Sequence, residues 1–364
     1  MQRRPFTLAV AFALVAGVLF VPVASAAGRP TCLVSNERTH HGYATLQAGI
    51  DAARPGDTLI VKGTCVGAPP SEPDRAASNV RKSLTIRGVS NGPFGPATLD
   101  GGGAARVLFV DFWDPERQGY TLTLENLTIT HGYGWDGSGG GGILVQGGTL
   151  ALANVTVVGN SAMAGGGIEI DLATVSITHS TVADNDASDY GGGVLAIRAN
   201  LAVANSFVST NRAGIGGGIS IWGGTVTLSS STVNGNVARQ GGGIANDSAP
   251  TPGTMTITGT EIQHNAATSG PGGGIFIGRG GVITISTSDV SENTAYWAGG
   301  ISNLGTLTFA APVTTVGGNT AEHWPGGIFS LGGYATIAGG CPTPAGYVTY
   351  YPANSPGDYG GFTC

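Results

Sequence analysis

The chain has 364 residues, of which only 10% are charged, and its formal net charge is −6. Because an average globular protein carries roughly 25% charged residues, this surface must consist mainly of uncharged polar residues and glycine. The apolar fraction of 41% is that of a folded protein rather than a disordered one. Nucleic acid is not an expected partner, because the sequence has no basic patch that would displace counterions.

Residues 1–26 have the composition of a secretory signal peptide. Arg3 and Arg4 provide the positive start, an apolar run follows at 8–23, and an Ala-Ser-Ala cleavage motif ends the segment. A retained membrane anchor is the alternative, but the run is short for a transmembrane helix. We therefore expect cleavage after Ala26, an extracellular, secreted protein, and no membrane span in the mature chain.

Residues 27–82 are expected to form an N-terminal cap with the first strands. Within them, residues 43–53 predict a short helix with Leu46 and Ile50 on one side. A Pro-Gly-Asp turn then leads into a strand at 58–61. Such a cap is needed because the open end of a solenoid would otherwise pair with other molecules.

Residues 83–340 contain a repeat of mostly 25 or 26 residues, marked by a glycine run and a following aliphatic residue. Each repeat carries three short strands that alternate polar and apolar residues, which predicts one inward face per strand. The expected fold is an all-β, right-handed parallel β-helix solenoid. Aliphatic residues at one repeat position are predicted to stack as an inner column: Val157, Val182, Val208, Val233, Ile262 and Val290.

An asparagine lies eight to ten residues before the aliphatic residue of each of the last seven repeats. Asparagine tolerates the left-handed backbone conformation of tight turns. Stacked in register, these side-chain amides are able to form hydrogen bonds from one coil to the next. We interpret them as a structural ladder: Asn160, Asn185, Asn211, Asn236, Asn265, Asn293 and Asn319.

Four cysteines form two local pairs, one near each end of the chain. We expect the disulfides Cys32–Cys65 and Cys341–Cys364, because disulfides persist in exported proteins. The spacings differ from those of zinc sites, so no metal site is expected from them. Residues 341–364 depart from the repeat and are predicted to form a disulfide-closed C-terminal cap.

The helix, the Pro-Gly-Asp turn and the Lys-Ser-Leu-Thr-Ile strand at 82–86 resemble the opening of the pectin-lyase-like superfamily. The Gly-Gly-Gly-Ile and Gly-x-Asn repeats look like the polymorphic-outer-membrane-protein-type repeats of secreted bacterial β-helix proteins. This resemblance covers roughly residues 43–340 and implies the fold more than an activity, since the scaffold hosts many functions. The Asp-Asp, Gly-His-Gly, Arg-x-Lys and Trp-x-Asp-His elements of the superfamily's enzymes are absent.

Acidic residues provide the best catalytic candidates. Glu169 and Asp171 are two apart on a predicted strand and are expected to face outward together, while Asp184, Asp186 and Asp189 occupy the next turn. Paired carboxylates carry out glycoside hydrolysis, and a lyase would add Ca²⁺; no other cofactor is expected. The alternative is a solvated acidic edge. Four histidines are interpreted as turn residues at different repeat positions: His131, His179, His264 and His323.

Aromatic residues recur close to the glycine runs and are expected along one edge of the solenoid. Tyrosine and tryptophan suit surfaces where one side of the ring stays wet, and they are the ring faces on which sugars stack. The alternative is that they shield the glycine corners from water. The candidate ligand-binding residues are Trp135, Tyr190, Trp222, Tyr296, Trp297 and Trp324.

Apolar residues that follow the glycine runs, among them Leu195 and Phe276, are expected to add an exposed stripe. The patterned aromatics predict a non-enzymatic module that binds a polysaccharide or cell-surface glycan. The alternative is a polysaccharide lyase or glycoside hydrolase that acts on an acidic polysaccharide. A minor alternative is an ice-binding or passive structural protein, suggested by outward threonines such as Thr225 and Thr227.

Overall fold

The computed structural model describes residues 31–67, 76–90, 94–117, 119–134, 139–247, 251–312, 314–323 and 326–330, and the backbone of 334–337 and 348–350. The predicted signal peptide, Trp135, Trp324 and the Cys341–Cys364 pair lie outside the described residues. These predictions therefore stay untested. No helix in the described part is long and apolar enough to span a membrane.

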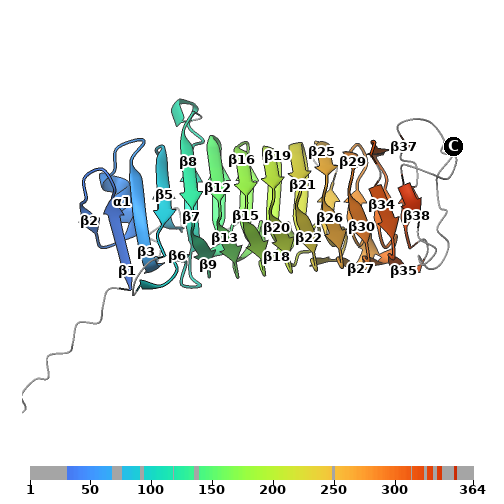
Figure 1. Ribbon diagram of the computed structural model, residues 1–364, viewed down its shortest axis with the longest axis horizontal. Coiled ribbons are helices and arrows are strands. Elements are labelled where there is room, and N and C mark those ends of the chain that lie inside the picture. Colours follow the sequence, from blue (N-terminus) through green and yellow to red (C-terminus); the bar gives the residue numbers. More distant parts are fainter. Residues whose placement is uncertain are drawn as a thin grey trace, which may run out of the picture. The chain divides into compact units, whose positions relative to one another are not determined.

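The described residues from Thr31 onward form a parallel β-solenoid of about nine turns (Figure 1), which confirms the predicted all-β solenoid fold. Outside the N-terminal cap, each strand pairs in parallel with the equivalent strand of a neighbouring coil. For example, β12 (Thr149–Ala153) pairs with β8 (Thr121–Glu125) and β16 (Thr174–Thr178), with threonine opposite threonine at the first position of all three strands. Equivalent residues of neighbouring coils are thus about 4.8 Å apart.

Three strand series make up the coils, joined by tight corners. The first series follows the glycine runs and consists of β4 (Ala76–Val80), β7 (Arg106–Asp111), β11 (Ile143–Gln146), β15 (Ile168–Asp171), the start of β19 (Val194–Ala204) and of β21 (Ile219–Ser229), β24 (Ile244–Asn246), β28 (Ile275–Ile277), β32 (Ile301–Asn303) and β36 (Ile328–Ser330). The second series consists of β5 (Leu84–Gly88), β8, β12, β16, the ends of β19 and β21, β25 (Gly253–Thr258), β29 (Val282–Ser286), β33 (Thr306–Phe309) and β37 (Tyr334–Ile337).

The third series precedes the asparagine positions and consists of β6 (Thr98–Asp100), β9 (Thr128–Thr130), β13 (Thr156–Val158), β17 (Thr181–Ala183), β20 (Phe207–Ser209), β22 (Thr232–Asn234), β26 (Glu261–Gln263), β30 (Asp289–Ser291), β34 (Thr314–Gly317) and β38 (Val348–Tyr350). Short edge strands follow the asparagines and form two small parallel sheets. Their members are β10 (Tyr133–Gly134), β14 (Ser161–Ala164) and β18 (Asp186–Tyr190), then β23 (Val237–Ala238), β27 (Ala266–Pro271), β31 (Thr294–Trp297) and β35 (Thr320–His323).

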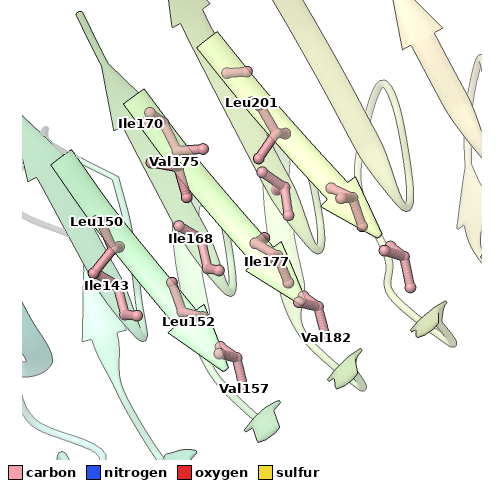
Figure 2. Close-up of a cluster of buried hydrophobic side chains, with 14 of the residues drawn as sticks. Ile143, Leu150, Leu152, Val157, Ile168, Ile170, Val175, Ile177, Val182 and Leu201 are labelled. Atoms are coloured by element: carbon pink, nitrogen blue, oxygen red, sulfur yellow. The ribbon is translucent and has the colours of Figure 1, made fainter. Parts of the chain in front are cut away.

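The core is a set of aliphatic columns inside the coils. Figure 2 shows Ile143, Leu150, Leu152 and Val157 together in one coil, with the same arrangement repeated in the next coils. Alternation along each strand puts every second side chain in this interior. The predicted inner column is confirmed, since its members are fully buried: Val157, Val182, Val208, Val233, Ile262 and Val290.

The N-terminal cap contains the predicted helix, α1 (Leu46–Ala52), with Leu46 and Ile50 buried against the first coil. It begins later than predicted, where the Thr45 hydroxyl accepts a hydrogen bond from the Ala48 N–H at 3.1 Å and caps the helix. A feature that the sequence did not indicate is β1 (Cys32–Asn36). This strand pairs antiparallel with β2 (Gly42–Tyr43) and with β3 (Thr58–Val66), which covers the end of the solenoid.

The predicted Cys32–Cys65 disulfide is confirmed and joins β1 to β3. In the same cap, the carboxylate of Asp57 accepts hydrogen bonds from Arg38 Nε at 2.7 Å, from Asn36 Nδ2 at 2.7 Å and from the Arg54 N–H at 2.9 Å. The Arg38 guanidinium holds the pKa of Asp57 well below its usual range, more than offsetting the burial that raises it. This carboxylate therefore fixes the Pro-Gly-Asp turn.

The seven repeat asparagines are buried and hydrogen-bonded from coil to coil. In Asn185, the side-chain Nδ2 and the backbone N–H both donate to Asn211 Oδ1 at 3.0 Å. The same two bonds recur at each step, with Nδ2-to-Oδ1 distances of 2.9–3.0 Å. Since buried amides require partners, this ladder satisfies one polar corner of the solenoid. It runs through Asn160, Asn185, Asn211, Asn236, Asn265, Asn293 and Asn319.

Candidate functional site

Three of the aromatic candidates, Tyr190, Tyr296 and Trp297, belong to one edge of the solenoid, where the edge strands meet the glycine runs. One residue from each coil occupies the same position there. Strand register relates most neighbours directly. Gln240 and Pro271 are related by a hydrogen bond instead: the Gly241 N–H donates to the Pro271 carbonyl, as the Gly216 N–H donates to the Gln240 carbonyl one coil earlier. This edge column consists of Ala164, Tyr190, Ile215, Gln240, Pro271, Trp297 and His323.

A groove of about 380 Å³ lies over β27, β31 and β35. Ala267, Ala295 and Ala321 are in register across its three strands, and the first two are almost fully buried. Alanine at these positions leaves room for the hollow, because a larger side chain would fill it. We call this hollow the edge groove; its other lining residues are Ala266, Thr268, Thr294, Tyr296, Thr320 and Glu322.

Tyr296 lies at the centre of three rings beside the edge groove. Its ring centroid is 4.9 Å from that of Trp297 and 4.5 Å from that of His323, with interplanar angles of 69° and 62°. Such edge-to-face contacts are favourable for aromatic rings, so they hold Tyr296 in place. Trp297 is 48% exposed and so presents ring surface to solvent. The structure thus brings together two predicted binding residues and adds His323, which sequence reasoning had set aside.

The edge groove combines ring surface with hydrogen-bonding groups and little charge. Thr268, Thr294 and Thr320 supply hydroxyls, and Glu322 is the one charged residue among those that line it. A shallow site with an aromatic wall and a few polar groups suits an amphipathic ligand such as a sugar. A uronic-acid polymer carries a carboxylate on every sugar. In this groove it would be repelled by Glu322, and none of the described residues that line the groove is a cation able to bind it.

Two other predicted binding residues form a second ring cluster on the same edge. Tyr190, at the end of β18, contacts Trp222 of β21 with ring centroids 4.3 Å apart and an interplanar angle of 71°. Both rings are half-buried. The indole Nε1 of Trp222 is buried and has no hydrogen-bond partner among the described residues. The pair was not predictable as a contact, because the two residues come from different strand series in successive coils.

The acidic candidates are not gathered into one exposed site. Asp171 is half-buried and accepts a hydrogen bond from Arg198 Nη2 at 3.0 Å. Asp184 and Asp186 are exposed, on either side of the ladder residue between them, and Asp189 is half-buried. Nowhere in the described part of the chain do three His, Cys, Asp or Glu side chains lie close enough to hold a metal ion.

Glu169 differs from its prediction, because only 9% of its surface is exposed. A Cβ on Gly139 would overlap Glu169 Oε2, and one on Gly165 would lie 2.8 Å from Glu169 Cβ. The glycine corner therefore folds back over this outward position. The expected pairing of Glu169 with Asp171 on an open face is wrong for this reason.

The predicted exposure of Leu195 and Phe276 in the apolar stripe is wrong for the same reason. Leu195 is 1% exposed and Phe276 is 5% exposed, although both point away from the inner core. Most corners have one glycine with positive φ that packs onto the following strand; a Cβ at Gly191 would meet the Leu195 N at 2.8 Å. These side chains fill a second, outer layer beneath the glycine corners.

Two of the histidines share one repeat position, although all four were expected at different positions. His131 and His264 occupy the same corner position, one residue after a third-series strand, and both have positive φ. Each contacts an acid of a neighbouring coil: His131 Nδ1 is 3.0 Å from Asp100 Oδ2, and His264 Nε2 is 2.5 Å from Glu292 Oε2. These are exposed surface pairs, which contribute little to stability.

Outward threonines stack in register on the second strand series. Thr227, Thr256, Thr284 and Thr308 are paired across β21, β25, β29 and β33. The array is interrupted by Val282 in a parallel column. Threonine is also simply a favourable strand residue, so ice binding stays a prediction; thermal hysteresis of the protein solution would test it.

Comparisons of the chain with protein-family models, with curated proteins and with solved structures find no match.

Proposed function

We propose that this protein is a secreted, non-enzymatic β-helix module that binds a polysaccharide or cell-surface glycan in the edge groove. The observation that carries the proposal is the half-exposed ring of Trp297 in contact with Tyr296, which lines a groove of about 380 Å³. A ring that is exposed to solvent yet fixed by its neighbours loses little freedom on binding, which favours affinity.

The proposal of secretion has support from two features. The Cys32–Cys65 disulfide suits an oxidising compartment, and residues 1–26 have the pattern of a signal peptide. The capping helix, the turn fixed by Asp57 and the glycine-corner repeats support membership of the pectin-lyase-like superfamily with polymorphic-outer-membrane-protein-type repeats. On that assignment the solenoid is right-handed.

Glycan binding is proposed to use the rings for stacking and the groove threonines for hydrogen bonds. A sugar ring has an apolar face and a polar edge, so it matches an aromatic wall beside hydroxyls. A favourable aromatic contact contributes on the order of 1 kcal/mol, equivalent to roughly a five- to tenfold change in affinity. Binding through one such ring is expected to be modest.

Electrophoresis in native gels that contain soluble polysaccharides tests the proposal. Retardation of the mature protein without loss of the polymer is the expected result. Trp297→Ala should lower the affinity for the polymer roughly five- to tenfold, so the variant should be retarded less. Its circular dichroism spectrum should be unchanged. Phe207→Ala is the matched control, because Phe207 is 55% exposed on the third strand series, away from the edge. Equal retardation of both variants would contradict the assignment of the groove.

The competing proposal is a lyase or hydrolase acting on an acidic polysaccharide. The observation that favours it is the Asp171–Arg198 ion pair. Asp171 is in strand register with Ile197 of the next coil and with Trp222 of the coil after that, so the pair lies near an aromatic residue. A lyase would require carboxylates that converge on Ca²⁺, and no such group is present among the described residues. Cleared zones in the gels, with new reducing ends or unsaturated sugars lost in Asp171→Asn, would establish catalysis and refute the binding-only proposal.

A further inference from the structure

The two aromatic clusters share one line along the solenoid. In the edge column, Tyr190 and Trp297 are separated by Ile215, Gln240 and Pro271, one residue per coil. Four steps of about 4.8 Å place them about 19 Å apart. In Figure 1, the edge strands β18, β27 and β35 follow each other along one side of the stacked coils.

The edge column between the clusters is uncharged and partly open, and the exposed Arg239 flanks it, with its Nη2 2.9 Å from the place of a Cβ on Gly214. Ile215, Gln240 and Pro271 are each half-buried and uncharged. The pyrrolidine and aliphatic surfaces, with one amide between them, continue the amphipathic character of the edge groove. Arg239 stands between Glu322 in the groove and Asp189 beside Tyr190, so no single sign of charge follows this line and a uniformly charged polymer would meet repulsion along it.

The second cluster contains a donor that a ligand oxygen would satisfy. In the part of the chain that the structure describes, Trp222 Nε1 is buried without a hydrogen-bond partner, and the indole contacts the Tyr190 ring. Buried N–H groups in proteins nearly always have an acceptor. A sugar hydroxyl that displaces the edge of the Tyr190 ring would supply one. This observation is independent of the groove and points to the same class of ligand.

We infer that the ligand is a linear, uncharged polysaccharide that lies parallel to the solenoid axis and contacts both the edge groove and the Tyr190–Trp222 pair. This inference rests on the proposed function. A disaccharide reaches only one cluster, whereas a chain of about 19 Å reaches both. Linking two contacts makes the second one intramolecular, which raises affinity by roughly 10²–10⁴ when the span is matched. The affinity should therefore depend steeply on chain length.

Isothermal titration calorimetry with cello-oligosaccharides, from the dimer to the octamer, tests this inference, with hydroxyethyl cellulose as the polymer. The expected result is a fall in Kd of at least about 100-fold once the oligosaccharide spans both clusters. Trp222→Ala should abolish that gain and leave dimer binding unchanged, while Trp297→Ala should weaken every length. Phe207→Ala, the same control as above, should behave as the unmodified protein.

Failures of the two proposals are distinguishable. If the dimer and the octamer bind equally, or if Trp222→Ala keeps the gain with length, the axial arrangement is refuted while a Trp297-dependent dimer still supports the edge groove. If neither the oligosaccharides nor the polymer bind, a neutral glucan is refuted as the ligand and this inference falls. Retardation by another polymer in the native gels would then leave the proposed function standing alone.

Discussion

Replacing Asn211 with alanine should strongly destabilise the solenoid, because this side chain makes four hydrogen bonds in a fully buried position. Its Oδ1 accepts from the N–H and the Nδ2 of Asn185, both at 3.0 Å. Its Nδ2 donates to the Val182 carbonyl at 2.9 Å and to Asn236 Oδ1 at 3.0 Å. Alanine removes all four and leaves the partners buried.

The expected magnitude follows from these bonds. A net contribution of about 1 kcal/mol per hydrogen bond gives roughly 4 kcal/mol for the four. The loss in stability is larger where a buried partner is left without an acceptor. It is smaller at Asn185, whose Nδ2 keeps its hydrogen bond to the Val157 carbonyl at 3.0 Å. We expect the free energy of unfolding to fall by roughly 3–5 kcal/mol.

Urea unfolding followed by circular dichroism measures the change, and Thr210→Ala is the matched control. Thr210 directly precedes Asn211 but its side chain is exposed, so its loss should change the free energy by less than about 0.5 kcal/mol. Hydrogen exchange should increase first in the coils on either side of residue 211, because solenoid coils contact only their neighbours. If Asn211→Ala loses less than about 1 kcal/mol, the reasoning that the ladder stabilises the fold is refuted.

Three further predictions concern a corner, the cap and the disulfide. Gly217→Ala should lower the free energy of unfolding by about 2 kcal/mol or more, because its Cβ would lie 2.4 Å from the Gly242 carbonyl oxygen. Gly119→Ala is the control and should be neutral or slightly stabilising, because nothing in the described part of the chain lies within 4 Å of its Cβ. Thermal melts that rank the two variants otherwise would contradict the corner geometry. The pKa of Asp57 is lowered in the folded state, so its stabilisation is present above its unfolded pKa of about 3.9 and is lost as pH falls below it; melting temperatures across pH should therefore fall less steeply on acidification in Asp57→Asn. Cys65→Ser should cost about 2–4 kcal/mol, and a reductant should lower the melting temperature of the unmodified protein more than that of the variant, which lacks this disulfide.

Much of the fold was predictable because the repeat places the same residue type at the same position in every coil. The inward alternation of the strands identified the core column of Val157 and its equivalents, all fully buried. The N-terminal helix was predictable from Leu46 and Ile50, although its start depended on the Thr45 cap. Tyr296 and Trp297 were identified as candidates from their place near a glycine run, and they do line or flank a groove.

Other parts of the site were not predictable, because they depend on how the chain folds back between coils. Period-2 alternation correctly turned Glu169 and Leu195 away from the core, but it carried no information that a glycine corner would cover them. Likewise His323 is far along the chain from Tyr296 and joins its ring cluster only through the pairing of β35 with β31.

The sequence by itself determined the solenoid, its coil length, the inner columns and the Cys32–Cys65 bond, since in-register parallel stacking converts a linear repeat directly into columns. Only the tertiary structure decided which outward side chains reach solvent. It buried Phe276, exposed Trp297 and brought Tyr190 against Trp222. The physical reason is that burial outside the core is set by the path of the corners, which fold back over the same outward position in successive coils, and strand alternation carries no information about that path.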